Sequence, residues 1–169
     1  MKELDISKYT KYTLELIFAE ADKLQGNLLK SISENTNKSF LLFAIYTSII
    51  SFSFFKLIEK EYSYCIILVG GISGCLFIIK NLFPNYIEFN GALPENMVHE
   101  YFNNFKEEEL DKEYLATQIQ SYNFALKKNN ITIEKMVRRF FTSVSILIVT
   151  LFIFSVITCF FSFTECAHT

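Results

Sequence analysis

The chain has 169 residues, of which 51% are hydrophobic and 17% aromatic, and its formal net charge is −2. A soluble domain of this size is rarely so apolar, so the composition favours an integral membrane protein. The charge is close to neutral and no long basic block is present, so we expect no nucleic-acid partner.

Residues 1–38 are predicted to form a cytosolic amphipathic helix. Charged and apolar residues alternate here without a continuous hydrophobic core, which argues against a signal peptide. The apolar positions recur three and four residues apart, as on one face of a helix: Leu14, Ile17, Ala21, Leu24 and Leu28. Gly26 interrupts this pattern and would allow a kink or a close helix contact.

Residues 39–83 are predicted to form a transmembrane hairpin. The first apolar run, residues 39–55, lies between Lys38 and Lys56, whose side chains can extend to the lipid headgroups. The second run, residues 62–79, is followed by Lys80 and ends before Pro84. Within it, Gly70 and Gly74 stand four residues apart, a spacing that lets another helix approach closely.

Residues 84–139 are predicted to form a cytosolic helical segment, with a long helix that starts near Glu108. This helix carries a heptad seam, whose members alternate four and three residues apart and are apolar or aromatic except for Asn129: Leu115, Ile119, Tyr122, Leu126, Asn129, Ile133, Met136 and Phe140. Such a seam faces partner helices. The apolar stripe of residues 14–28 is one natural partner, and the same seam in other copies would make a homo-oligomer.

Asn129 has two readings. An Asn in an apolar seam often fixes the register and the number of helices, because its amide must find a partner. Alternatively, the helix breaks at Asn129-Asn130 and the side chain faces water. The sequence does not decide between the two.

Residues 140–163 are predicted to form a third transmembrane helix, continuous with the seam helix, and residues 164–169 an outer tail. No Asp, Glu, Lys, Arg or His occurs from Phe140 to Phe163, and roughly 20 apolar residues cross a bilayer. Ser155, Thr158 and Ser162 share a face that could line a pore, or each hydroxyl could bond its own backbone.

The basic residues set the expected orientation, because cytoplasmic flanks collect Lys and Arg. Lys38, Lys80, Arg138 and Arg139 are predicted to anchor the spans at the cytosolic leaflet. The N-terminus would then lie in the cytoplasm and the C-terminus outside a bacterial inner membrane. Lys127, Lys128, Arg138 and Arg139 could also meet an anionic nucleotide, but anchoring is the favoured reading.

No catalytic constellation is found in the sequence. In this topology His99 and His168 lie on opposite sides of the membrane. The four cysteines lack the spacing of a zinc site, and the acidic run from Glu107 to Glu113 lacks that of a calcium loop. We therefore expect no enzyme activity, no metal and no cofactor.

Three short stretches together resemble small membrane effectors of bacterial anti-phage systems, namely the Pycsar transmembrane effectors and the SLATT proteins. They are residues 35–42 (NTNKSFLL), residues 91–95 (GALPE), and the segment from Tyr122 through Asn129 to Lys135. The resemblance implies a protein that stays quiet until a soluble cytosolic partner or a signalling nucleotide triggers it to oligomerise or rearrange and compromise the inner membrane.

Together these observations predict an all-α integral membrane protein with three transmembrane helices and a cytosolic helical bundle or coiled coil continuous with the last span. The leading hypothesis for function is an oligomeric defence effector that permeabilises or depolarises the membrane. The alternative is a non-enzymatic membrane scaffold or regulatory subunit that binds a soluble partner through its cytosolic helices. A phage-type holin ranks third, because holins seldom carry so long a cytosolic middle segment.

Overall fold

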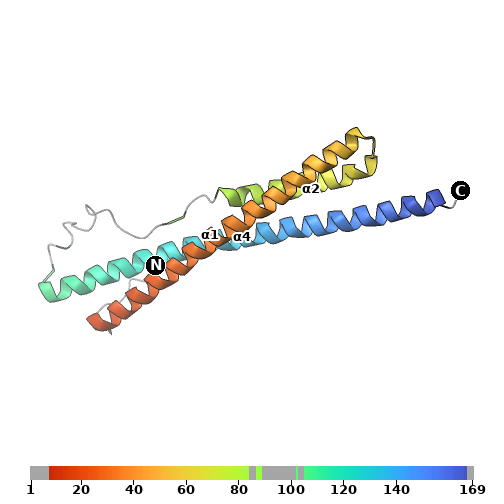
Figure 1. Cartoon of the computed structure of the whole chain (residues 1–169). Helices are drawn as coiled ribbons and strands as arrows, with labels where there is room; N and C mark the ends of the chain where they lie inside the picture. Colours follow the sequence, from red (N-terminus) through yellow and green to blue (C-terminus); the bar gives the residue numbers. More distant parts are fainter. Residues whose placement is uncertain (1–7, 84–86, 89–101, 103–104, 167–169) are drawn as a thin grey trace. The chain divides into compact units, whose positions relative to one another are not determined.

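The computed structural model describes residues 8–83, 87–88, 102 and 105–166, apart from the side chains of residues 107–108 and 161–166. Regular structure in this part of the chain is entirely helical (Figure 1): α1 (Lys11–Ile58), the short 3₁₀ helix η2 (Tyr62–Tyr64), α2 (Cys65–Leu82) and α4 (Glu107–Cys166). Three of these helical segments are long and apolar enough to cross a membrane. The all-α prediction is confirmed for the described residues.

Neither position at which the sequence allowed a kink or break interrupts a helix: α1 continues through Gly26, and α4 continues through Asn129-Asn130. No heavy atom lies within 4 Å of where a Cβ would stand at Gly26, so Gly26 makes no close helix contact. The cost of one glycine, about 1 kcal/mol relative to alanine, is small beside the cooperativity of the flanking helix. Most of the predicted cytosolic segment before Phe105, including residues 91–95 (GALPE), lies outside the described residues.

Contacts divide the chain into two compact units, which we call the first and second units. The first comprises Met1–Ser31 with Tyr86–Ile133, and the second Ile32–Asn85 with Glu134–Thr169. Both α1 and α4 therefore contribute to both units. The second unit begins before the predicted membrane entries at Lys38 and Arg139, because the Asn81 side chain of α2 bonds to the Met136 carbonyl of α4.

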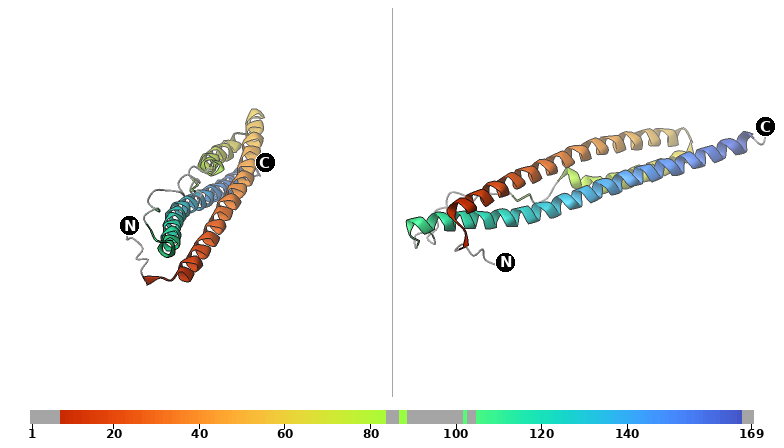
Figure 2. Two further views of the ribbon diagram at one scale, coloured as in Figure 1. Left: turned by 90° about the vertical axis from the view of Figure 1, so that its left-hand side faces the viewer. Right: turned by 90° about the horizontal axis from the view of Figure 1, so that it is seen from below.

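In the first unit α1 and α4 lie side by side and run in the same direction (Figure 2). Lys11 pairs with Asp111 near the start of both helices. About three turns further along, the Tyr122 hydroxyl donates to the Asp22 carboxylate at 2.8 Å, and the Phe18 ring meets the Tyr122 ring edge-on at 5.2 Å. The contacts advance together along the two helices, so the pairing is parallel.

In the second unit α2 packs against the later part of α1 and against α4, antiparallel to both (Figure 1). The chain reverses between α1 and η2 at Lys60, whose φ is 68°. Buried Leu42, Tyr46 and Ile78 form the hydrophobic core. The partly buried side chains that pack against it are Phe43, Cys75, Phe140, Val144 and Leu147.

Most of the apolar surface of the three candidate spans is not covered by the chain itself. The most apolar windows of α1, α2 and α4 are only 17%, 22% and 11% buried. Large side chains such as Phe55, Leu76 and Phe152 are more than 60% exposed. Such contiguous apolar surface requires lipid or another apolar surface around it.

Candidate functional site

The second unit buries polar residues at seven-residue intervals along its helices. Ser39, Tyr46 and Ser53 follow one another in this way on α1, and Ser143 and Thr150 do so on α4. All five are at most 8% exposed. We call this set, together with Asn81 of α2, the polar seam. In a segment able to cross a membrane, buried polar groups must find partners inside the protein.

Tyr46, Ser143 and Gly74 form the first node of the polar seam and join three helices. The Tyr46 hydroxyl donates to the Ser143 carbonyl at 2.5 Å, and the Ser143 hydroxyl donates to the Gly74 carbonyl at 2.9 Å. The two hydroxyl oxygens lie 3.1 Å apart. The donated bonds fix the rotation of α1 relative to α4 and of α4 relative to α2.

Asn81 forms the second node. Its Nδ2 donates to the Met136 carbonyl at 2.8 Å and lies 3.4 Å from the Ser39 hydroxyl, which itself donates to the Asn35 carbonyl. Asn81 is fully buried, and its Oδ1 has no hydrogen-bond partner among the described residues. A buried amide oxygen without a partner is less favourable than a bonded one by about 1–3 kcal/mol.

The two glycines expected to serve helix packing face different helices of the same unit. A Cβ at Gly70 would overlap the Thr150 side chain of α4, and a Cβ at Gly74 would overlap the Tyr46 ring of α1. Their neighbour Gly71 stands close to Ile50 of α1. The close approach that these glycines allow therefore occurs within one chain.

The hydroxyl face predicted as a pore lining bonds its own helix in this structure. The Ser155 hydroxyl donates to the Leu151 carbonyl at 2.9 Å, and the Thr158 hydroxyl lies 3.0 Å from the Phe154 and Ser155 carbonyls. The side chain of Ser162 lies outside the described residues. This geometry matches the second of the two readings left open, and a pore face made of these residues stays a prediction.

The heptad seam predicted for α4 is turned toward the interior of the single chain. Four of its members are buried, namely Ile119, Tyr122, Asn129 and Met136, and the other four, Leu115, Leu126, Ile133 and Phe140, are partly buried. The seam is thus covered within one chain, while the homo-oligomer stays a prediction that needs other surfaces.

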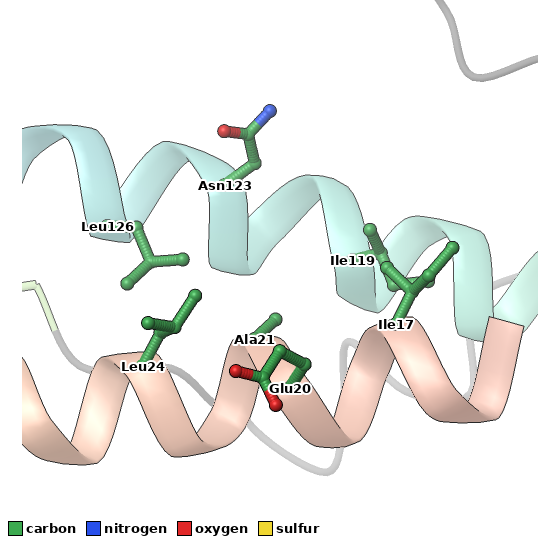
Figure 3. Close-up of a pocket in the computed structure, with 7 residues that line it drawn as sticks. All are labelled: Ile17, Glu20, Ala21, Leu24, Ile119, Asn123 and Leu126. Carbon is green, nitrogen blue, oxygen red and sulfur yellow. The ribbon is translucent and has the colours of Figure 1, made fainter.

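A shallow groove runs between α1 and α4 in the first unit (Figure 3). Its volume is about 320 Å³, and its lining combines the apolar stripe of α1 with the seam of α4: Ile17, Glu20, Ala21, Leu24, Ile119, Asn123 and Leu126. Leu24 and Leu126 point toward each other, whereas Asn123 points away from α1 (Figure 3). The side chains of the stripe and the seam meet here without filling the space between the helices.

Asn129 does not face water. It is fully buried, its Oδ1 accepts the Glu88 backbone N–H at 3.0 Å, and its Nδ2 donates to the Glu88 carbonyl at 2.9 Å. Gln25 of α1, only 4% exposed, donates to the same carbonyl at 2.9 Å. The Lys128 ammonium pairs with the Glu88 carboxylate at 2.6 Å. Four interactions therefore converge on one residue outside any helix.

The predicted membrane anchors lie where side chains can reach outward. Lys38, Lys80 and Arg138 are exposed and Arg139 is half-buried. In the part of the chain that the structure describes, no group of three or more His, Cys, Asp or Glu side chains could hold a metal ion.

The polar seam was missed from the sequence, although a signal was present. On α4 the alternation of four and three residues continues past Phe140 to Ser143, Leu147, Thr150 and Phe154. In a run where nearly every residue is apolar, the pattern of apolar residues does not show which helix face is buried. Only the polar members, Ser143 and Thr150, indicate that face. Asn81 was missed because a single polar residue next to a basic one at a helix end looks like an interfacial residue.

Comparison of the chain with models of protein families, with curated proteins and with solved structures finds no match.

Proposed function

We propose that the chain is a three-span bacterial inner-membrane effector of anti-phage defence, without enzyme activity, which permeabilises or depolarises the membrane when a cytosolic event triggers it. In this proposal the first unit lies in the cytosol, the second in the membrane, and the protein acts as a homo-oligomer. The described conformation is the resting state, since its polar seam is closed.

The polar seam is the observation that carries the proposal. Hydroxyls and an amide are sequestered in the middle of an otherwise apolar bundle, and they alternate with apolar residues at helical spacing. A bundle that opens along this seam would present Ser39, Tyr46 and Ser143 to a water-filled path.

Shared helices support a link between a cytosolic trigger and the membrane. Both α1 and α4 belong to the first and the second unit. A rotation or shift of α1 against α4 in the first unit would therefore act on helices whose later turns carry Tyr46 and Ser143.

The charged residues support the proposed orientation. Lys38, Lys80, Arg138 and Arg139 all flank the same ends of the three spans, given that α1 and α4 run parallel and α2 antiparallel. The positive-inside tendency favours a cytosolic side for these ends and for the first unit.

The test is uptake of a membrane-impermeant dye by bacteria that express the chain under control, alone and with its neighbouring genes and phage. The proposal expects uptake when the trigger is present. The double variant Thr150→Val with Ser53→Ala removes two hydroxyls from the polar seam and is expected to reduce dye uptake. The double variant Ser155→Leu with Thr158→Val tests whether the hydroxyl face of α4 lines the path instead. Intact membranes under every condition would contradict the proposal.

A second function, a scaffold or regulatory subunit that binds a soluble partner, is favoured by the groove of the first unit. Leu24 is 48% exposed at its edge although it belongs to the apolar stripe. In this case a purified product of a neighbouring gene would bind the wild-type chain, and Leu24→Glu would abolish binding while membranes stay intact throughout.

A further inference from the structure

Three side chains, those of Gln25, Lys128 and Asn129, together bind the backbone and the carboxylate of Glu88. Asn129 engages both the N–H and the C=O of one residue, Gln25 adds a second donor to the same C=O, and Lys128 binds the side chain. Both lone pairs of the Glu88 carbonyl are thereby used, and the Lys128 ammonium also lies 4.4 Å from the centre of the Phe124 ring.

Gln25 and Asn129 occupy positions that the helix pattern otherwise gives to interior residues. Gln25 lies seven residues before buried Ile32 on α1, and Asn129 lies seven residues after buried Tyr122 on α4. Apolar side chains at both places would pack the two helices without any third segment. The amides instead make the packing of α1 on α4 depend on Glu88.

The site also holds a buried group that its bonds leave unsatisfied. Gln25 Oε1 is buried and has no partner among the described residues. A buried amide oxygen without a partner disfavours the closed arrangement. After release of Glu88, the side-chain amides of Asn129 and Gln25 could bond with each other or with water. These replacement bonds reduce the free-energy cost of releasing Glu88.

We propose that the Glu88 site is an intramolecular latch: while Gln25, Lys128 and Asn129 hold Glu88, α1 and α4 stay in the resting register, and its release is the step on which the trigger acts. This inference rests on the proposed function and adds its regulation.

Hydrogen exchange of the full-length protein in detergent tests the bonds without reference to function. The Glu88 amide should be protected in the wild type and exchange about tenfold faster in Asn129→Leu, because one buried hydrogen bond is lost. Asn123→Leu is the matched control on the same helix and should leave this amide unchanged. Equal exchange in the wild type and Asn129→Leu would refute the latch.

Two variants at position 88 separate the main-chain bonds from the ion pair. Glu88→Ala keeps the backbone N–H and C=O of residue 88. Glu88→Pro removes the N–H, which donates to Asn129 Oδ1 in the wild type. We expect dye uptake without a trigger for Glu88→Pro and Asn129→Leu, and little or none for Glu88→Ala. Asn129→Leu keeps the seam apolar, so it remains informative if Glu88→Pro does not fold.

The outcomes distinguish the latch from the proposed function. If the triggered wild type takes up dye but Asn129→Leu without a trigger does not, the latch is wrong and the effector function stands. If no variant takes up dye under any condition, the effector function fails and the regulatory role of the latch fails with it, even where exchange confirms the bonds.

Discussion

At the scale of single residues, replacement by alanine is expected to have opposite effects at two glycines, Gly26 of α1 and Gly74 of α2. A Cβ at Gly26 meets no atom within 4 Å, so this glycine only weakens the helix. A Cβ at Gly74 overlaps the Tyr46 ring, so this glycine allows α2 to approach α1. Spacing in the sequence pointed to Gly74 but could not separate a useful glycine from a costly one at Gly26.

The contrast gives the first prediction. Gly74→Ala is expected to destabilise the purified protein by about 1–3 kcal/mol, as overpacking does. Gly26→Ala is expected to stabilise it by about 0.5–1 kcal/mol, because alanine is the better helix former. Thermal unfolding in detergent, followed by circular dichroism, measures both. Shifts of the same sign would contradict the packing described.

The second prediction concerns the Tyr46 hydroxyl. Tyr46→Phe removes the donor to the buried Ser143 carbonyl and should lower the free energy of unfolding by about 0.5–1.5 kcal/mol. Tyr62→Phe, at a side chain that is 74% exposed, serves as the control and should have no effect. The same unfolding measurement applies, and an unchanged Tyr46→Phe would mean that the node contributes no stability.

At the scale of elements, the periodicity of α4 predicted a seam and two possible partners for it, the apolar stripe of residues 14–28 and the same seam in other copies, but it could not choose between them. The alternation from Leu115 to Phe140 predicted a helix face that packs on other helices, and the structure buries that face. A heptad does not say whose helix fills the opposite side. Here it is α1 of the same chain, identified by the contact of Tyr122 with Phe18 and Asp22. Glu88 could not have been foreseen, because it lies outside any periodic pattern.

The third prediction tests this pairing. Ile119→Asp places a charge at a position that is 7% exposed and should separate α1 from α4 in the first unit, since burial of an unpaired charge costs several kcal/mol. Trypsin should then cleave at Lys23 and Lys30 faster than in the wild type.

Ile131→Asp is the matched control, because Ile131 lies on the same helix and is 51% exposed. It should leave the cleavage rate unchanged, and native mass measurement on the same sample reports any change of assembly separately. Equal cleavage of the two variants would show that the seam does not hold α1.

At the scale of the whole molecule, composition and charge carried the prediction of a membrane protein. Three helices are long and apolar enough to span, and most of their apolar surface is uncovered. The predicted sidedness rests on basic residues such as Lys38 and Arg138, which favour the cytosolic side when the chain inserts into the membrane. Contacts inside the chain do not carry that information, so the orientation has to be measured directly.

Sidedness of the termini is the measurement on which the account depends most. One variant keeps only the native Cys166 and replaces the other cysteines (Cys65→Ser, Cys75→Ser, Cys159→Ser); a second lacks all four and carries Lys2→Cys. An impermeant maleimide that passes only the outer membrane is expected to label Cys166 in intact bacteria, and the Lys2→Cys variant only after lysis. Labelling of the Lys2→Cys variant in intact cells, or of Cys166 only after lysis, would contradict three crossings with the first unit inside.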